Sequence, residues 1–149
     1  MKIFSFYILA LMGGVFLAVQ AGFNSHLGGL LKQPILAVIA TSISSVVFGS
    51  ILFLLIGKIN FHTITFTNIP WYLWFIGGLF SVLGISLYFY TIPRLGISKM
   101  IALGLFGQLI FSLIAGKYGW LNLPIEPLTM KRILGAIAMT IGIILINTK

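Results

Sequence analysis

Five long apolar runs follow one another along the chain, separated by short polar stretches. A helix rises about 1.5 Å per residue and the hydrocarbon core of a bilayer is about 30 Å thick, so roughly 20 apolar residues span it. We therefore expect five transmembrane helices. Their predicted ranges are about 3–22, 34–57, 70–92, 97–117 and 128–146.

The polar stretches between the runs hold turn residues and helix starts. A connection with Asn24, His26, Gly28, Gly29 and Lys32 precedes Pro34, which stands where a first-turn proline belongs. A Thr-rich link, 58–68, precedes Pro70 and an interfacial group of aromatic residues, and the tetrapeptide 93–96 is a tight turn. No hydrophilic domain remains, so we expect one all-α membrane domain over residues 1–149.

Composition places most of the surface against lipid. The chain is 60% hydrophobic and 7% charged, whereas a soluble domain is about 25% charged. The first run, Ile3–Val19, could also pass for a signal peptide cleaved after Ala21. Because the chain that follows is itself membrane-spanning, we expect an uncleaved first helix in a multi-pass membrane protein.

The charged residues exclude several classes of function. Nine Lys and Arg stand against one acidic residue, Glu126. The basic residues are scattered singly at the ends of apolar runs, where they meet lipid phosphates rather than nucleic acid. With no Cys and two distant His residues we expect no metal site and no cofactor. The chain lacks a Ser-His-Asp set, paired carboxylates and a phosphate loop, so we do not expect an enzyme.

Small residues form stripes along the predicted helices. In the fourth, Gly104, Gln108 and Ser112 share one face at spacings of four. Such stripes allow close backbone approach in lipid. We expect the following glycines to serve helix packing or dimer contacts: Gly77, Gly84, Gly104, Gly135 and Gly142.

A few polar side chains at membrane depth are candidates for binding a solute. Amides both donate and accept hydrogen bonds, so they can hold a polar solute without carrying charge. The alternative is that they form interhelical hydrogen bonds. The predicted substrate-binding set is Gln20, Asn24, Ser81, Tyr88, Gln108 and Ser112. Because no carboxylate lies within a span, we expect a neutral, zwitterionic or anionic solute rather than a simple cation.

The distribution of basic residues predicts almost nothing about the orientation of the chain in the membrane. If the predicted helices alternate, five Lys and Arg fall on the N-terminal side and the remaining four of the nine on the other. An excess in cytoplasmic loops normally sets the orientation. Either a few residues near one helix decide, or the chain inserts both ways and pairs antiparallel with itself. Two inverted five-helix copies would form the inverted repeat that many transporters use.

Several short motifs, in their order and spacing, resemble one known family. They include Gln20-Ala21 with Asn24, the turn Pro93-Arg94-Leu95-Gly96, and Gly107-Gln108-Leu109 with Ser112. The chain resembles, over nearly its whole length, the YdcZ-like family of small bacterial inner-membrane proteins in the drug/metabolite transporter superfamily.

The resemblance implies half of a ten-helix transporter of the EamA type, assembly from two such halves, and export of a small molecule. It carries functional positions over to Gln20, Asn24 and Gln108. The family tends to place Asp-His before the Phe-Gly that closes the fourth helix, whereas this chain has Gly116-Lys117 before Tyr118-Gly119. A mechanism that uses that Asp or His does not transfer.

We therefore expect a small-molecule exporter that works by alternating access as a dimer, most simply an antiparallel homodimer in membrane lipid. Two alternatives remain open. The chain could be a non-transporting membrane partner of a larger complex, or one half of an obligate heterodimer with a related chain.

Overall fold

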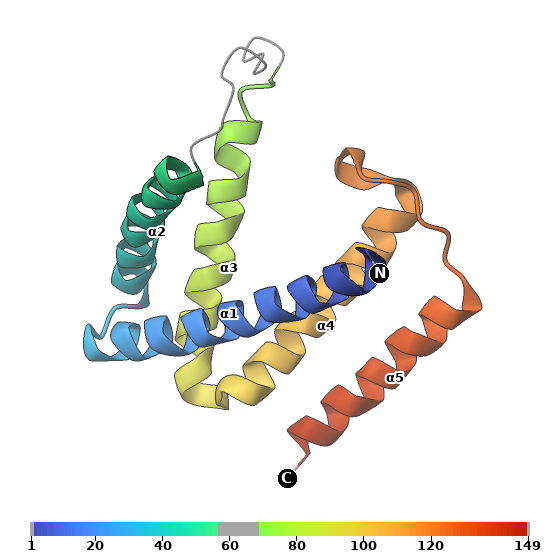
Figure 1. Ribbon diagram of the computed structural model, residues 1–149. Helices are drawn as coiled ribbons and strands as arrows, with labels where there is room; N and C mark the ends of the chain where they lie inside the picture. Colours follow the sequence, from blue (N-terminus) through green and yellow to red (C-terminus); the bar gives the residue numbers. More distant parts are fainter. Residues whose placement is uncertain (1, 57–68, 149) are drawn as a thin grey trace. The chain divides into compact units, whose positions relative to one another are not determined.

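The computed structural model describes residues 2–56 and 69–148 and is all-helical over these ranges (Figure 1). The predicted Thr-rich link with His62 lies outside the described residues. The elements are α1 (Lys2–Leu30), α2 (Pro34–Ile56), α3 (Leu73–Leu95), α4 (Ile97–Tyr118), the one-turn 3-10 helix η3 (Trp120–Asn122) and α5 (Met130–Asn147). The described residues form five α-helices, and each of them is long and apolar enough to cross a membrane. The predicted fold class is confirmed.

The helix α1 is longer than the sequence predicted. It was expected to end at Gly22, but it continues to Leu30, so residues predicted as a connection are helical. Within this extension Ser25 is only 3% exposed and Gly28 is buried. Polar residues are compatible with a helix when they lie on its packed face, and the extension contains no proline to stop it. At 1.5 Å per residue α1 is about 44 Å long.

A tight turn joins α1 to α2. Lys32 adopts a left-handed conformation with φ 54°. Its N–H donates to the Gly29 carbonyl at 3.1 Å, and the Gln33 N–H donates to the Gly28 carbonyl at 3.2 Å. This pair of bonds is the Schellman arrangement that satisfies the last carbonyls of a helix. The whole connection is therefore only three residues long, 31–33.

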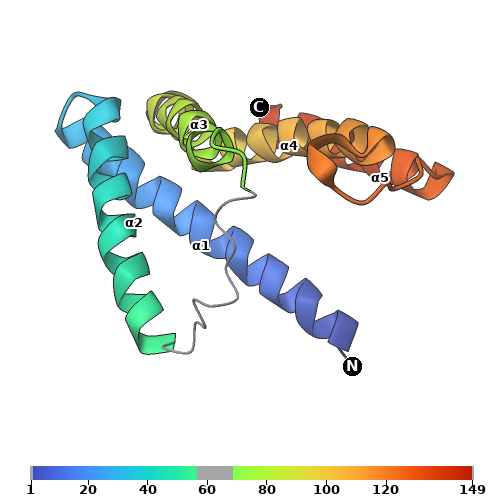
Figure 2. The same ribbon diagram turned by 90° about the horizontal axis from the view of Figure 1, so that it is seen from above.

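The core of the first compact unit, Met1–Arg94, sits near this turn. α1 and α2 meet at their joined ends and diverge from there (Figures 1 and 2). Gly28 permits the close approach, because a Cβ there would lie 3.3 Å from the Pro34 Cα. Ala37 and Val38 of α2 and Phe89 of α3 form the buried cluster. The far ends of α1 and α2 are exposed apolar surface.

The boundaries of α3 also differ from the prediction. The predicted helix began at Pro70, but α3 begins at Leu73. Before it lies a turn in which the Leu73 N–H donates to the Pro70 carbonyl at 3.1 Å. At the other end, α3 passes through Pro93 and ends at Leu95. The predicted four-residue turn is reduced to Gly96, whose φ of 83° suits only glycine well. Proline removes one backbone donor, but so close to the helix end it does not stop the helix.

The second compact unit, Leu95–Lys149, is a hairpin of α4 and α5. The two helices run side by side in both views (Figures 1 and 2). Lys99 donates to the Asn147 carbonyl at 3.4 Å, so the start of α4 meets the end of α5. Gly119 ends α4 one residue later than predicted, with φ 63°. α5 begins at Met130 rather than 128, because Thr129 is extended and acts as its N-cap.

Candidate functional site

Several hydroxyl groups of α2 donate to carbonyls of their own helix. Thr41 donates to the Ala37 carbonyl at 2.7 Å, and Ser42 donates to the Val38 carbonyl at 3.0 Å. Both bonds join residues four apart, which is the common way for Ser and Thr to hide a hydroxyl in a helix. These groups therefore cost little to place in lipid.

The two predicted amides of α1 border its packed face. Gln20 and Asn24 are both half-buried and lie one turn apart. They flank Ala21, which is 7% exposed, and Ser25, which is 3% exposed. The amides thus lie beside the buried residues of α1.

The two predicted residues of α3 have different surroundings. Tyr88 is half-buried and packs against the cluster of Ala37, Val38 and Phe89, as does Leu27 of α1. Tyr88 therefore lies where α1, α2 and α3 meet. Ser81, two turns earlier on α3, is exposed.

The remaining predicted residues belong to the second unit. Gln108 and Ser112 are both exposed on α4, and Gly104 on the same face is half-buried. Ser112 donates its hydroxyl to the Leu109 carbonyl at 2.8 Å. The substrate-binding role of all six residues stays a prediction.

A pocket of about 400 Å³ lies between the start of α2 and the C-terminal half of α3. Its wall is mostly apolar. The lining residues are Gln33, Pro34, Ile35, Leu83, Ser86, Leu87 and Tyr90. The Ser86 Oγ is buried and has no hydrogen-bond partner among the described residues.

One edge of this pocket carries a cation. The Arg94 guanidinium lies over the Tyr90 ring, with its Cζ 3.6 Å from the ring centroid. It also donates to the Tyr90 carbonyl. Lys32 immediately precedes the lining residue Gln33, and both basic side chains are exposed.

Sequence reasoning did not select this pocket. Ser86 and Tyr90 are a polar and an aromatic residue at membrane depth, but the predicted set took Ser81 and Tyr88 instead. A signal was present, because Ser86, Tyr90 and Arg94 recur every four residues and so share one face of a helix. Gln33 falls in the predicted connection before Pro34. In the structure it ends the three-residue turn between α1 and α2, and it lines the pocket there.

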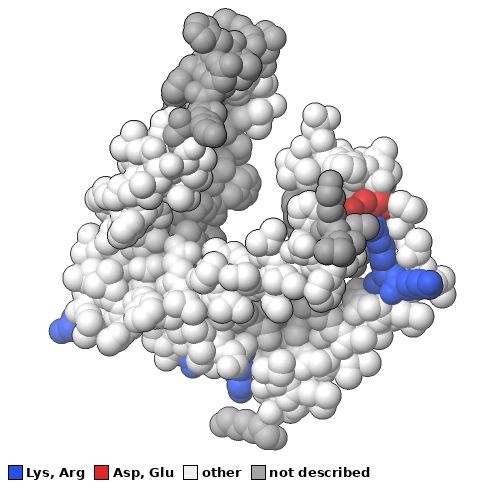
Figure 3. Space-filling model, viewed as in Figure 1, with Lys and Arg blue, Asp and Glu red and all other residues white. Residues whose placement is uncertain are grey.

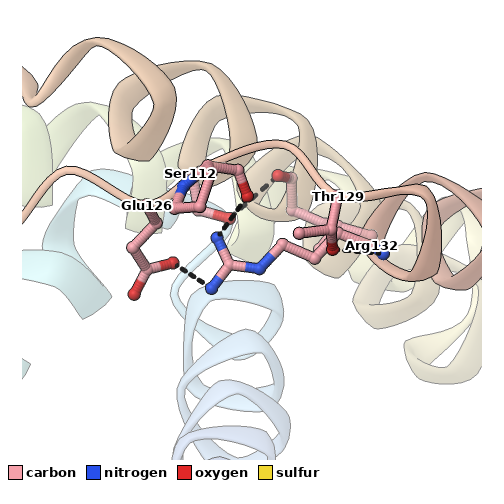
Figure 4. A network of polar contacts seen from close by, with 6 residues as sticks. Ser112, Glu126, Thr129 and Arg132 are labelled. Carbon is pink, nitrogen blue, oxygen red and sulfur yellow. Dashed lines mark hydrogen bonds and ion pairs between the residues drawn. The ribbon is translucent and has the colours of Figure 1, made fainter.

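The acidic residue of the chain lies outside the spans. Glu126, in the segment between η3 and α5, pairs with Arg132 at 2.8 Å (Figure 4). Figure 3 shows the acidic surface directly beside basic surface. The Glu126 N–H donates to the Gly116 carbonyl at 2.9 Å. The Arg132 side chain also donates to the Pro127 carbonyl at 3.4 Å. No buried carboxylate is available within the spans to hold a cation or to take up a proton.

A scan against protein-family models matches residues 5–145 to the family described as "Putative inner membrane exporter, YdcZ". The chain belongs to the YdcZ family. Searches of the curated proteins and of the solved structures give no match. The predicted family is thus confirmed, over residues 5–145.

Membership in the YdcZ family agrees with the fold. The chain is a multi-pass inner-membrane protein of an exporter family, and its described residues form five helices long and apolar enough to span a membrane. Within the described ranges, 2–56 and 69–148, there is no group of three His, Cys, Asp or Glu residues that would hold a metal ion.

Proposed function

We propose that this YdcZ-family protein exports a small solute by alternating access, as an antiparallel dimer of five-helix halves. The observation that carries the proposal is the family match over residues 5–145, in a chain with an odd number of spans. An odd number places the two termini on opposite sides, so an inverted second copy completes an inverted repeat.

The exposure of the spans supports a second copy. In the most apolar window of each helix, between 0% and 11% of the residues are buried within the chain. Few side chains in these windows are therefore buried within their own compact unit, and the others are free to face lipid, the other unit or a partner chain. Small residues at several of these faces would let another helix approach closely.

The proposed solute is neutral, zwitterionic or anionic. The chain has one acidic residue, Glu126, and it is paired with Arg132 outside the spans. A cationic solute would find no carboxylate in the spans, and only aromatic ring faces could attract its charge. The amides Gln20, Asn24 and Gln108 are the proposed polar contacts of the solute.

The first experiment measures the orientation of the chain in the membrane. Because the chain has no cysteine, a single introduced cysteine is the only thiol that can react. A single cysteine placed after Lys149 is labelled in intact cells with a membrane-impermeant thiol reagent, and again after permeabilisation. We expect about half of the protein to react from outside if the copies insert both ways. Labelling that is complete or absent in intact cells would contradict the antiparallel homodimer and would favour a related partner chain.

Transport is tested separately at the amides. We expect Gln108→Ala to abolish solute-dependent flux in proteoliposomes while the dimer persists in size-exclusion chromatography. The matched control is Ser50→Ala, because Ser50 is outside the predicted binding set and its hydroxyl already donates to the Val46 carbonyl of its own helix at 2.8 Å. Loss of the dimer in Gln108→Ala would show that the amide is structural, and unchanged flux would remove it from the site.

A further inference from the structure

The pocket between α2 and α3 has an order of polarity that matches a particular class of ligand. Arg94 stands at the end of α3, followed inward by Tyr90, then Ser86 and Leu87, then Leu83. From Arg94 to Leu83 the helix rises about 16 Å. A cation, an aromatic ring, a hydroxyl and then aliphatic side chains follow one another from the membrane face toward the interior.

Basic residues gather at the mouth of the pocket. Because helices that cross a membrane in succession alternate in direction, the start of α2 and the end of α3 lie at the same membrane face. Lys32 precedes α2 and Arg94 lies in the last turn of α3, so both cations belong to this face of the first unit. The Arg94 guanidinium is held over the ring of the lining residue Tyr90 at 3.6 Å.

The interior of the pocket offers one unused polar group. The Ser86 Oγ is buried without a hydrogen-bond partner among the described residues. A buried hydroxyl without a partner costs free energy, which an acceptor on a ligand would recover. Around it, Ile35, Leu83 and Leu87 offer only apolar contact.

We propose that this pocket binds an anionic phospholipid. The phosphate lies at Arg94 and Lys32, and basic pockets between membrane helices are known to take such head groups. The Ser86 hydroxyl donates to an ester carbonyl of the glycerol region. One acyl chain lies along Leu83 and Leu87.

The walls distinguish this ligand from other occupants. A free phosphate would gain nothing from the apolar wall, and a hydrophilic solute would leave it without a partner. An apolar helix of a second copy would leave both cations and the Ser86 hydroxyl unused. Only an amphiphile with an anionic head matches all three parts of the pocket.

Native mass spectrometry of the detergent-purified protein tests the site, with phosphatidylglycerol and phosphatidylcholine as the probes. We expect phosphatidylglycerol to bind at least ten-fold more tightly than phosphatidylcholine. The double variant Lys32→Gln and Arg94→Gln should lose about ten-fold or more of that affinity, because each cation near an anionic head group contributes. Arg94→Lys should keep it within a few-fold.

The matched control is Lys117→Gln, which removes an exposed cation from the last turn of α4. It should leave phosphatidylglycerol binding unchanged, because Lys117 is not part of the pocket. Equal loss in Lys117→Gln and in the double variant would mean that the lipid responds to net charge alone, and would overturn the proposal.

Two further variants test the interior. Leu87→Trp should fill the pocket and expel the lipid without changing a charge, and Ser86→Ala should weaken binding about two- to five-fold. If Leu87→Trp does not fold, Ser86→Ala and the double variant decide. Three results would each overturn the proposal. The first is unchanged lipid binding in these variants, and the second is displacement of the lipid by inorganic phosphate. The third is a Leu87→Trp variant that dissociates a dimer but still binds the lipid.

Discussion

Individual glycines of this chain differ in what a side chain would meet. At Gly119, φ is 63° and an added Cβ would lie 2.8 Å from the Ile125 Cγ1. At Gly107, inside α4, an added Cβ would meet nothing within 4 Å among the described residues. The fold of the chain therefore requires a glycine at position 119, whereas twelve positions earlier, at Gly107, it does not.

We expect Gly119→Ala to lower the free energy of unfolding by about 1–2 kcal/mol, because a left-handed backbone is costly for a residue with a Cβ. The added methyl group also forces Ile125 to move. Thermal unfolding in detergent measures the effect, with Gly107→Ala as the control that should not destabilise. Equal melting temperatures for Gly119→Ala and the parent protein would show that the α4 end is not held in this conformation.

The ion pair between Glu126 and Arg132 should contribute little to stability. Its side chains are 57% and 39% exposed, and exposed pairs contribute about 0–1 kcal/mol. The segment is also held by the bond from the Glu126 N–H to the Gly116 carbonyl, which does not need the carboxylate. Glu126→Gln should therefore lower the melting temperature less than Gly119→Ala does. A larger loss would assign the carboxylate a structural role.

At the scale of the helices, number and type could be predicted from the sequence but several boundaries could not. Long apolar runs identify spans because lipid offers no partner to a free backbone. The end of α1 was wrong because polar Asn24 was read as part of a connection, whereas it lies beside the packed face of a helix. The end of α3 was wrong because Pro93 marks the last turn and Gly96 makes the break.

The joint of α1 and α2 gives a prediction at this scale. An added Cβ at Gly28 would lie 3.3 Å from the Pro34 Cα and 3.5 Å from the Ala37 Cβ. We expect Gly28→Val to destabilise the first unit by about 1–3 kcal/mol, as overpacking does. The adjacent Gly29 has nothing within 4 Å of an added Cβ among the described residues, so Gly29→Ala is the control.

Limited proteolysis of the detergent-solubilised protein measures this difference. Faster cleavage in the first unit is expected for Gly28→Val than for Gly29→Ala. If both variants are cleaved like the parent protein, the two helices do not depend on the close approach at Gly28.

For the molecule as a whole, the candidate site could be predicted only in part. Residue types mark polar groups at membrane depth, but they do not tell which hydroxyl a helix already satisfies. Ser112 bonds its own helix, whereas the Ser86 Oγ has no partner among the described residues. This difference depends on packing between α2 and α3, which sequence periodicity does not contain.

The glycines of α5 belong to the scale of the assembly. Added Cβ atoms at Gly135 and Gly142 would meet nothing within 4 Å among the described residues. If the proposed dimer uses this stripe, Gly135→Leu should weaken the dimer at least ten-fold while the monomer keeps its helix content. Analytical ultracentrifugation in detergent measures the dimer, and Ile137→Leu on the same helix is the control. An unchanged dimer would place the interface on other helices.

The hydroxyls of α2 that donate to their own helix have a consequence for insertion of the chain into the membrane during synthesis. Thr41, Ser42 and Ser50 each donate to the carbonyl four residues earlier. From Ser42 to Ile56 every residue of this helix is exposed. As the ribosome delivers it, α2 can leave the translocon and enter the bilayer with the Thr41, Ser42 and Ser50 hydroxyls already bonded within the helix, before α3 exists. Biogenesis can therefore proceed helix by helix, and assembly becomes a later step within the membrane.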